Sequence, residues 1–166
     1  NFFIYTGHGS TAGKNNNAGG ICLKNTVSTE KMLSTLKLKD NALVLFMHVC
    51  YGAGSTAKDL KDIGIQEAEK RVRHYAFPFF EVGAAAYYAN NFDNGVYSFL
   101  ELFLTGKSIY EAYKTSVRKP SIFALDKDAP SKQGKSVCIA STLNHGYATY
   151  TTTDAEGNKK EYKIKA

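Results

Sequence analysis

Residues 42–50 read ALVLFMHVC, and this stretch decides the fold. Every position from Ala42 to Met47 is apolar, without the alternation of a strand that has one face in water. Such a strand is expected inside a parallel sheet, where helices cover both faces. The run leads directly into His48, Val49 and Cys50, so the carboxyl end of this strand carries reactive side chains.

Further strands and helices are predicted on both sides of this run. Phe2–Tyr5 and Val82–Ala89 are apolar runs that predict two more buried strands. Apolar residues at helical spacing predict helices over 65–75, 96–104 and 109–117, the last capped by Ser108. In the first of these helices, Arg71 is expected on the solvent face. Because the strands alternate with helices, the sequence indicates an α/β fold with a mostly parallel sheet.

Two segments near the carboxyl end have a different character. The polar stretch Lys119–Gly134 contains Pro120 and Pro130 and predicts a long loop. Tyr147–Ile164 alternates in part around Glu156-Gly157-Asn158, which predicts a β-hairpin. The length of 166 residues fits one domain spanning 1–166.

Composition and charge exclude several classes of function. Lys and Arg number 21 against 15 Asp and Glu, a net charge of +6, and the basic residues are scattered. A nucleic-acid partner is therefore not expected, because that would need a clustered basic surface. No apolar run approaches the roughly 18 residues of a membrane span, so no membrane partner is expected. The three cysteines form neither a disulfide framework nor a CxxC pair.

Reactive residues follow two of the predicted strands. The first strand leads into Gly7-His8-Gly9, and the strand from Ala42 leads into Cys50. His8 and Cys50 are 42 positions apart, and the chain between them holds a glycine-rich loop, a short helix and the second strand. That content suits a crossover between neighbouring parallel strands. We therefore expect His8 and Cys50 at the same edge of the sheet, where ligands bind in α/β folds.

A thiol beside an imidazole is a unit of nucleophilic catalysis. The imidazole favours the thiolate of Cys50, and the ring of His8 can then protonate a leaving amine. The backbone amides of Gly9 and Cys50 can point at a developing oxyanion. This chemistry requires neither a metal nor an organic cofactor. Taken singly, a strand-end cysteine is more often a small buried residue, and a His-Gly pair is more often a turn.

Two other kinds of site compete for the same residues. His8, His48 and Cys50 are possible zinc ligands, and strand alternation would place His48 and Cys50 on one face, but no fourth ligand is evident. The loop Gly7–Lys14 resembles a phosphate loop, but its first and last glycines are six positions apart where five are needed. If His8 is catalytic, we expect His48 to line the pocket.

The pattern as a whole resembles the caspase-like cysteine peptidases, a group that includes caspases, legumains, clostripain and gingipains. The matching stretches are IYTGHGS at 4–10 and LVLFMHVCYG at 43–52. The segment GAAAYY at 83–88, followed by an apolar helix and GKS at 106–108, is also similar to bacterial members. The resemblance covers residues 1–117, and its specific part is 1–55.

The resemblance implies a caspase-like three-layer sandwich, here lacking the family's first two strands and carrying a C-terminal β-hairpin. It implies a cysteine endopeptidase acting on protein or peptide substrates, with Cys50 and His8 as the dyad and the amides of Gly9 and Cys50 as the oxyanion hole. The bacterial members favour an extracytoplasmic location. Members that cleave after basic residues carry an acidic residue near the cysteine; here Glu81 and Asp93 are the acidic candidates for substrate binding.

Two alternatives stay open at this point. The first alternative to a peptidase is a caspase-like scaffold that binds a peptide without cutting it, and the second is a doubly wound domain that holds an anion or nucleotide in the Gly7–Gly13 loop. The sequence features named so far do not decide between them. The first keeps every motif described above. The second predicts that Cys50→Ala leaves binding intact.

Overall fold

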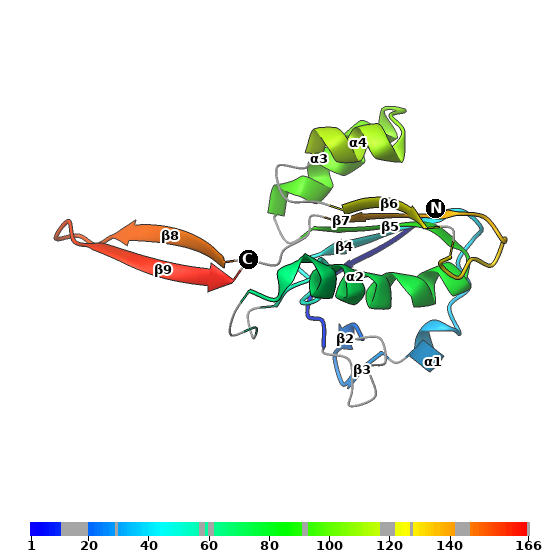
Figure 1. The fold of residues 1–166 in the computed structure, drawn as a ribbon, viewed down its shortest axis with the longest axis horizontal. Coiled ribbons are helices and arrows are strands. Elements are labelled where there is room, and N and C mark those ends of the chain that lie inside the picture. Colours follow the sequence, from blue (N-terminus) through cyan, green and yellow to red (C-terminus); the bar gives the residue numbers. More distant parts are fainter. Residues whose placement is uncertain are drawn as a thin grey trace.

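Five strands form the central sheet of the computed structural model (Figure 1). The structure describes residues 1–10, 20–28, 30–56, 59, 62–90, 93–116, 122–126, 128–141 and 147–165. The strands lie in the order β1 (Phe2–Thr6), β4 (Ala42–Met47), β5 (Ala84–Asn90), β7 (Val137–Ser141) and β6 (Ile122–Asp126). The first four are parallel, and β6 pairs antiparallel with β7. The sheet is therefore mostly parallel, as the sequence predicts.

Helices cover both faces of this sheet. Helix α2 (Gly64–Glu81) lies along one face, and α3 (Asp93–Leu104) and α4 (Ile109–Ser116) lie on the other (Figure 1). We call these the α2 face and the α3–α4 face. The result is an α/β fold whose helix, sheet and helix layers are compatible with a three-layer sandwich.

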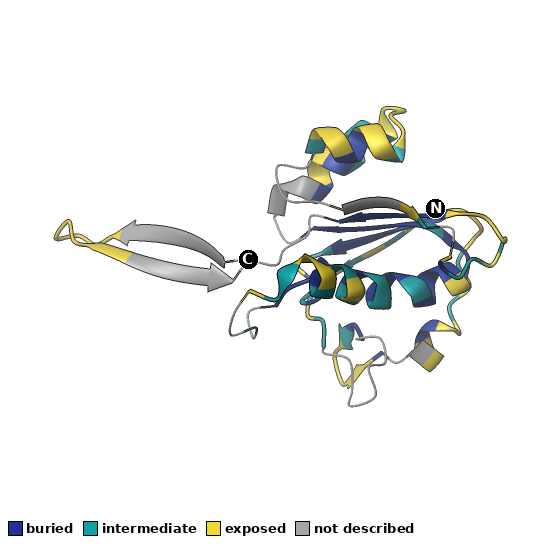
Figure 2. Ribbon diagram, viewed as in Figure 1, coloured by how far each residue is buried: buried dark blue, intermediate teal, exposed yellow. Residues whose placement is uncertain are grey.

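Strand β4 is central because its side chains are apolar in both directions. Val44 and Phe46 join the hydrophobic cluster on the α2 face, and Leu43 and Leu45 join the cluster on the α3–α4 face. The Phe46 ring contacts the rings of four aromatic residues on the α2 face. Figure 2 shows the consequence, a sheet whose middle strands are buried between the helix layers.

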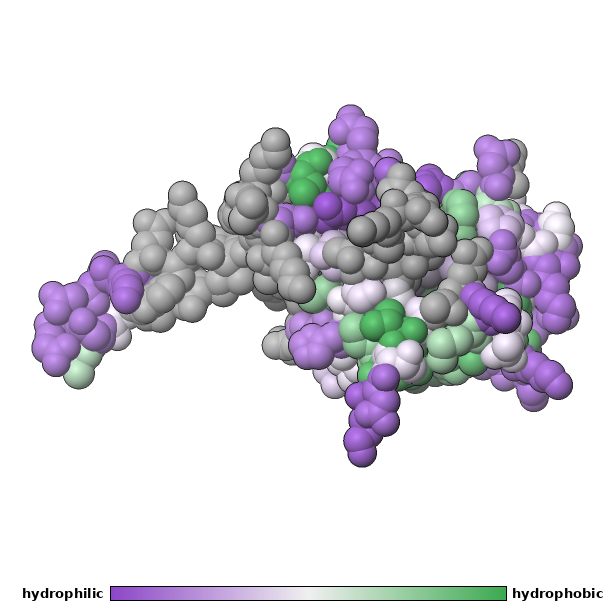
Figure 3. Space-filling view, turned by 90° about the horizontal axis from the view of Figure 1, so that it is seen from below, coloured by the Kyte–Doolittle hydropathy of each residue, from purple (hydrophilic) through white to green (hydrophobic). Residues whose placement is uncertain are grey.

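Smaller elements lie on the α2 side and at the carboxyl end. The two-stranded ribbon β2 (Cys22–Leu23) and β3 (Thr26–Val27) and the short helix α1 (Glu30–Leu33) lie below the sheet in Figure 1. Figure 3 views the molecule from that side and shows apolar residues surrounded by hydrophilic side chains. The exposed apolar side chains of these elements and α2 are Leu23, Val27, Met32 and Ile65.

The predicted carboxyl-terminal hairpin is confirmed. Strands β8 (Tyr147–Thr153) and β9 (Lys159–Lys165) pair antiparallel and extend away from the sheet (Figure 1). The carboxylate of Asp154 accepts hydrogen bonds from the amides of Glu156 and Asn158, and Gly157 has a φ of 85°. A left-handed glycine inside an aspartate-capped turn is what the sequence of this connection favours.

Several predictions about individual elements are wrong. The first predicted helix does not stop at Tyr75 but continues through Pro78 to Glu81, because Phe79 and Phe80 extend its buried side. The predicted loop 119–134 contains strand β6, whose apolar residues pair with β7.

Strand β1 is not a buried strand. It is an edge strand, and the side chains of Phe2 and Ile4 are 43% and 51% exposed. Its apolar sequence alone does not show that β4 is its one partner among the strands that the structure describes. No helix of the described residues is long and apolar enough to cross a membrane.

Candidate functional site

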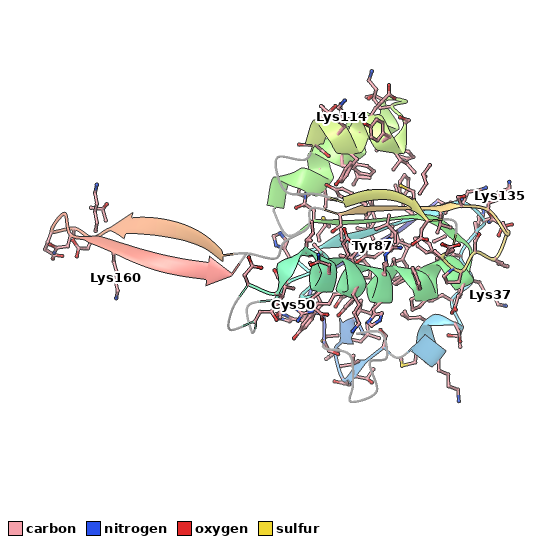
Figure 4. The ribbon with its side chains drawn as sticks, viewed as in Figure 1. Lys37, Cys50, Tyr87, Lys114, Lys135 and Lys160 are labelled. Atoms are coloured by element: carbon pink, nitrogen blue, oxygen red, sulfur yellow. The ribbon has the colours of Figure 1, made fainter. Side chains whose placement is uncertain are left out.

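His8 and Cys50 leave the sheet at the same edge. Strands β1 and β4 are parallel neighbours, and their last paired residues are Thr6 and Met47. His8 follows Thr6 by two positions, and Cys50 follows Met47 by three. Figure 4 labels Cys50 at this edge of the sheet. The predicted neighbourhood of the two segments is therefore present in the fold.

The two segments also touch. Gly9 packs so closely against the Cys50 segment that a Cβ atom at position 9 would overlap the carbonyl oxygen of Cys50. The same Cβ would lie 2.7 Å from the Tyr75 hydroxyl and 2.9 Å from a methyl carbon of Val49. A side chain at position 9 would force the His8 and Cys50 segments apart, so this position requires glycine.

The segment that carries His8 is held on its other side by β2. The Cys22 amide donates to the His8 carbonyl at 2.8 Å, and the Ser10 amide donates to the Gly20 carbonyl at 2.9 Å. The Tyr5 hydroxyl donates to the Cys22 carbonyl at 2.7 Å. The His8 backbone is thus fixed between β2 and the end of β4, while the residue itself is exposed to solvent.

The chain around Cys50 has an unusual conformation. His48 has a φ of 55° and Tyr51 a φ of 67°, and both are left-handed although neither is glycine. The turn is closed by the Gly52 amide, which donates to the Val49 carbonyl at 2.9 Å, and by the Tyr51 amide, which donates to Ser55 at 3.0 Å. Left-handed residues of this kind carry a strain that concentrates at functional sites.

Because the strand ends at Met47 and His48 is left-handed, strand alternation does not extend to Cys50. The prediction that His48 and Cys50 share one strand face is therefore wrong. His48 is exposed, and its amide donates to the Asn90 carbonyl at 3.2 Å. That bond joins the end of β4 to the end of β5.

Two backbone amides at the site have no hydrogen-bond acceptor among the described residues. Among the residues that the structure describes, neither the Gly9 amide nor the Cys50 amide donates a hydrogen bond. Both belong to the two segments in contact. Cys50 itself is half-buried and packs against the cluster on the α2 face. The site thus combines a half-buried cysteine, a histidine segment in contact with it and two amides that have no acceptor among the described residues.

Two side chains of α2 contact the site, and sequence reasoning missed both. The Tyr75 hydroxyl donates to the Ser10 carbonyl at 2.8 Å, two residues beyond His8. Burial is the largest cause that raises the pKa of Tyr75, so this hydroxyl stays protonated.

Arg71 does not face solvent as predicted. It ion-pairs with Asp59 at 2.9 Å, and its guanidinium lies 5.3 Å from the ring centroid of Tyr51. Its partner is twelve residues away in the loop that follows Cys50, so helical periodicity alone cannot reveal the contact. A third contact comes from β5, where the buried Tyr87 hydroxyl donates to the Gly52 carbonyl at 2.8 Å.

The structure places one of the two acidic candidates for substrate binding. Glu81 ends α2 just before β5 begins, which places it at the sheet edge opposite Cys50. Asp93 begins α3, but its side chain lies outside the described residues.

Neither competing kind of site gains support from the geometry. Within the described part of the chain, no group of three His, Cys, Asp or Glu residues is arranged to hold a metal. The Gly7–Lys14 loop is described only as far as Ser10, so its phosphate-loop interpretation lies largely outside the described residues.

The remaining cysteines differ from Cys50. Cys138 is buried in β7, and burial raises the pKa of its thiol to about 12. Cys22 is half-buried in β2, on the far side of the His8–Gly9 segment from Cys50. All three cysteines are free thiols.

Comparison of the chain with models of known protein families, with curated proteins and with solved structures found no match.

Proposed function

We propose that this chain is a caspase-like cysteine peptidase domain whose dyad is Cys50 and His8. The observation that carries the proposal is the packing of Gly9 against the carbonyl oxygen of Cys50. That contact joins the two segments that carry Cys50 and His8, which are 42 positions apart in the chain. The left-handed residues on both sides of Cys50 add support, since strain is retained where geometry matters.

The proposed reaction has two steps. The Cys50 thiolate attacks the scissile carbonyl carbon and forms a carbon–sulfur bond, while the Gly9 and Cys50 amides hold the oxyanion. The carbon–nitrogen bond then breaks, and the leaving amine takes its proton from the His8 imidazolium. Water, deprotonated by His8, then attacks the thioester carbon; the carbon–sulfur bond breaks, the carboxylic acid leaves, and the thiolate and imidazolium are restored. Neither of these reaction steps uses a cofactor.

A peptide library with mass-spectrometric detection tests the proposal. The chain is expected to cleave a subset of peptides, and Cys50→Ala and His8→Ala are each expected to lower kcat/KM by roughly 1,000-fold or more. Cys22→Ala is the matched control, because it removes a neighbouring half-buried thiol that has no role in the proposed chemistry. A peptidyl electrophile should label Cys50 and leave Cys138 unmodified.

Two results would overturn the proposal. Cleavage that survives Cys50→Ala would exclude the thiol as the nucleophile. A chain that binds library peptides without cutting them, and whose Cys50 reacts no faster than Cys22, would be a non-catalytic scaffold.

A further inference from the structure

We infer that helix α2 sets the separation between His8 and Cys50 through two positioning residues, Arg71 and Tyr75. The inference rests on the proposed function and deepens it. It assigns a role to a helix that supplies neither the nucleophile nor the acid.

Tyr75 fixes the histidine side of the site. Its hydroxyl bonds to the Ser10 carbonyl, and it lies next to Gly9 at the point where that residue meets Cys50. The Ser10 amide is in turn bonded to Gly20. One side chain of α2 therefore holds a segment 65 positions away in the chain, with Gly9 and His8 immediately before the bonded residue.

Arg71 fixes the cysteine side. Its guanidinium contacts the ring of Tyr51, the carboxylate of Asp59 and, at 3.4 Å, the carbonyl of Gly54. These three contacts span the loop that begins at Cys50. A second acidic partner, Glu67, accepts from Nε of Arg71 at 3.0 Å and holds the guanidinium in place from the helix itself.

The two positioning residues are one helical turn apart. Residues at i and i+4 lie on the same side of a helix, so Arg71 and Tyr75 face the site together. Between and beyond them, Val72, Ala76, Phe79 and Phe80 are buried in the cluster on the α2 face. The helix is thus anchored to the sheet. Its two side chains hold both loops of the site, so the helix fixes the position of one loop relative to the other. A displacement of about 1 Å in such a geometry can lower a rate by roughly 100-fold.

Tyr75→Phe and Arg71→Met test the inference. Each is expected to lower kcat by about 10-fold to 100-fold while KM changes by less than about 2-fold, because the contacts position the dyad rather than bind substrate. Alkylation of Cys50 by iodoacetamide at pH 6 should slow in both variants, since this rate depends on the imidazole close to the thiol.

The fold offers a matched control for each variant. Arg73→Met removes another arginine of α2, which ion-pairs with Asp126 of β6, far from the site. Tyr113→Phe removes another buried hydroxyl, which donates to the Ser141 carbonyl on the α3–α4 face. Both controls are expected to lower the melting temperature and to leave kcat, measured on folded protein, within about 2-fold of the parent.

The alkylation data separate failure of this inference from failure of the proposed function. If His8→Ala does not slow alkylation of Cys50, the dyad does not exist, and both the proposed function and this inference are wrong. If His8→Ala slows alkylation but Tyr75→Phe and Arg71→Met do not, only the inference is wrong. If the four tyrosine and arginine variants lose kcat in proportion to their loss of melting temperature, α2 acts through stability alone and the inference is also wrong.

Discussion

The two faces of the sheet have similar helical cover but different relations to the site. On the α2 face, Tyr75, Arg71 and Tyr87 send polar groups to the backbone of the His8 and Cys50 segments or the loop after Cys50. On the α3–α4 face, two buried side chains bond elsewhere: the Asn90 amide donates to the Tyr88 hydroxyl, and the Tyr113 hydroxyl donates to the Ser141 carbonyl at the end of β7. Within the described residues, therefore, one face holds the site in place and the other mainly supplies apolar burial.

The largest test of this contrast is the removal of one large core side chain from each face. Phe46→Ala on the α2 face should lower the free energy of unfolding by about 3–5 kcal/mol, and Leu45→Ala on the other face by about 2–5 kcal/mol. Chemical denaturation measures both. At a temperature where each variant is folded, only Phe46→Ala should also slow the reaction of Cys50, because Phe46 packs against Tyr75.

If the reaction of Cys50 slows equally in both variants, the α2 face has no special role in holding the site. Phe46→Leu provides a milder version if the alanine variant does not fold.

Alkaline pH is expected to weaken the α3–α4 face through Cys138. Burial raises the pKa of this thiol from 9.0 to about 12, so the folded state favours the neutral form. The stabilisation is complete below pH about 9 and is lost as the pH rises toward 12, with a cost on the order of 2–3 kcal/mol by pH 11. Cys138→Ala should flatten the decline of unfolding free energy across this range. If the unfolding free energy of Cys138→Ala declines with pH as steeply as that of the parent, other groups cause the loss of stability at alkaline pH.

Tyr87 and Tyr113 allow the two faces to be compared with the same substitution. Each is a buried tyrosine whose hydroxyl donates to a backbone carbonyl, one on each face. Replacement of either by Phe should cost about 1.5 kcal/mol, because a buried carbonyl loses its donor. Only Tyr87→Phe is expected to change the labelling rate of Cys50, since its partner Gly52 belongs to the Cys50 loop. If Tyr87→Phe leaves the labelling rate of Cys50 unchanged, only the contacts made by α2, and not those of β5, distinguish the α2 face from the α3–α4 face.

The smallest effect is expected at the start of α4. The Ser108 hydroxyl accepts from the Glu111 amide at 3.2 Å, and the Glu111 carboxylate accepts from the Ser108 amide at 3.0 Å. Ser108→Ala should cost about 1 kcal/mol and leave the site unchanged.

The same cap predicts a weak acid dependence. The hydrogen bonds from Ser108 lower the pKa of Glu111, so their stabilisation is present above the ordinary carboxyl pKa and is lost as the pH falls through the lowered value. Urea denaturation between pH 3 and 7 should show a smaller acid dependence for Ser108→Ala. An identical acid dependence would mean that the exposed cap contributes nothing measurable.

The sequence predicts the centre of the fold well because burial there is complete. Ala42–Met47 is apolar at every position, and only a strand with neighbours on both sides and helices on both faces suits that pattern. Strand β6 was missed for the opposite reason. It is a short edge strand inside a polar stretch, and only its pairing with β7 makes it a strand.

The site could be predicted only in part. The two strand ends and their parallel pairing bring His8 and Cys50 to one edge, and local patterns suffice for that expectation. The contacts of Arg71 and Tyr75 depend on how α2 packs, and their partners are 12 and 65 positions away. Helical periodicity assigns a charged residue such as Arg71 to solvent, and it carries no information about a carboxylate in a distant loop.

The left-handed residues beside Cys50 restrict how this domain can be redesigned. Val, Ile and Thr are poorly tolerated at positions 48 and 51, because a β-branched side chain clashes with a left-handed backbone. Glycine relieves the strain but adds freedom to the unfolded chain and removes the ring beneath Arg71. A mutagenesis library aimed at new selectivity should therefore keep both positions fixed and vary other side chains around the site.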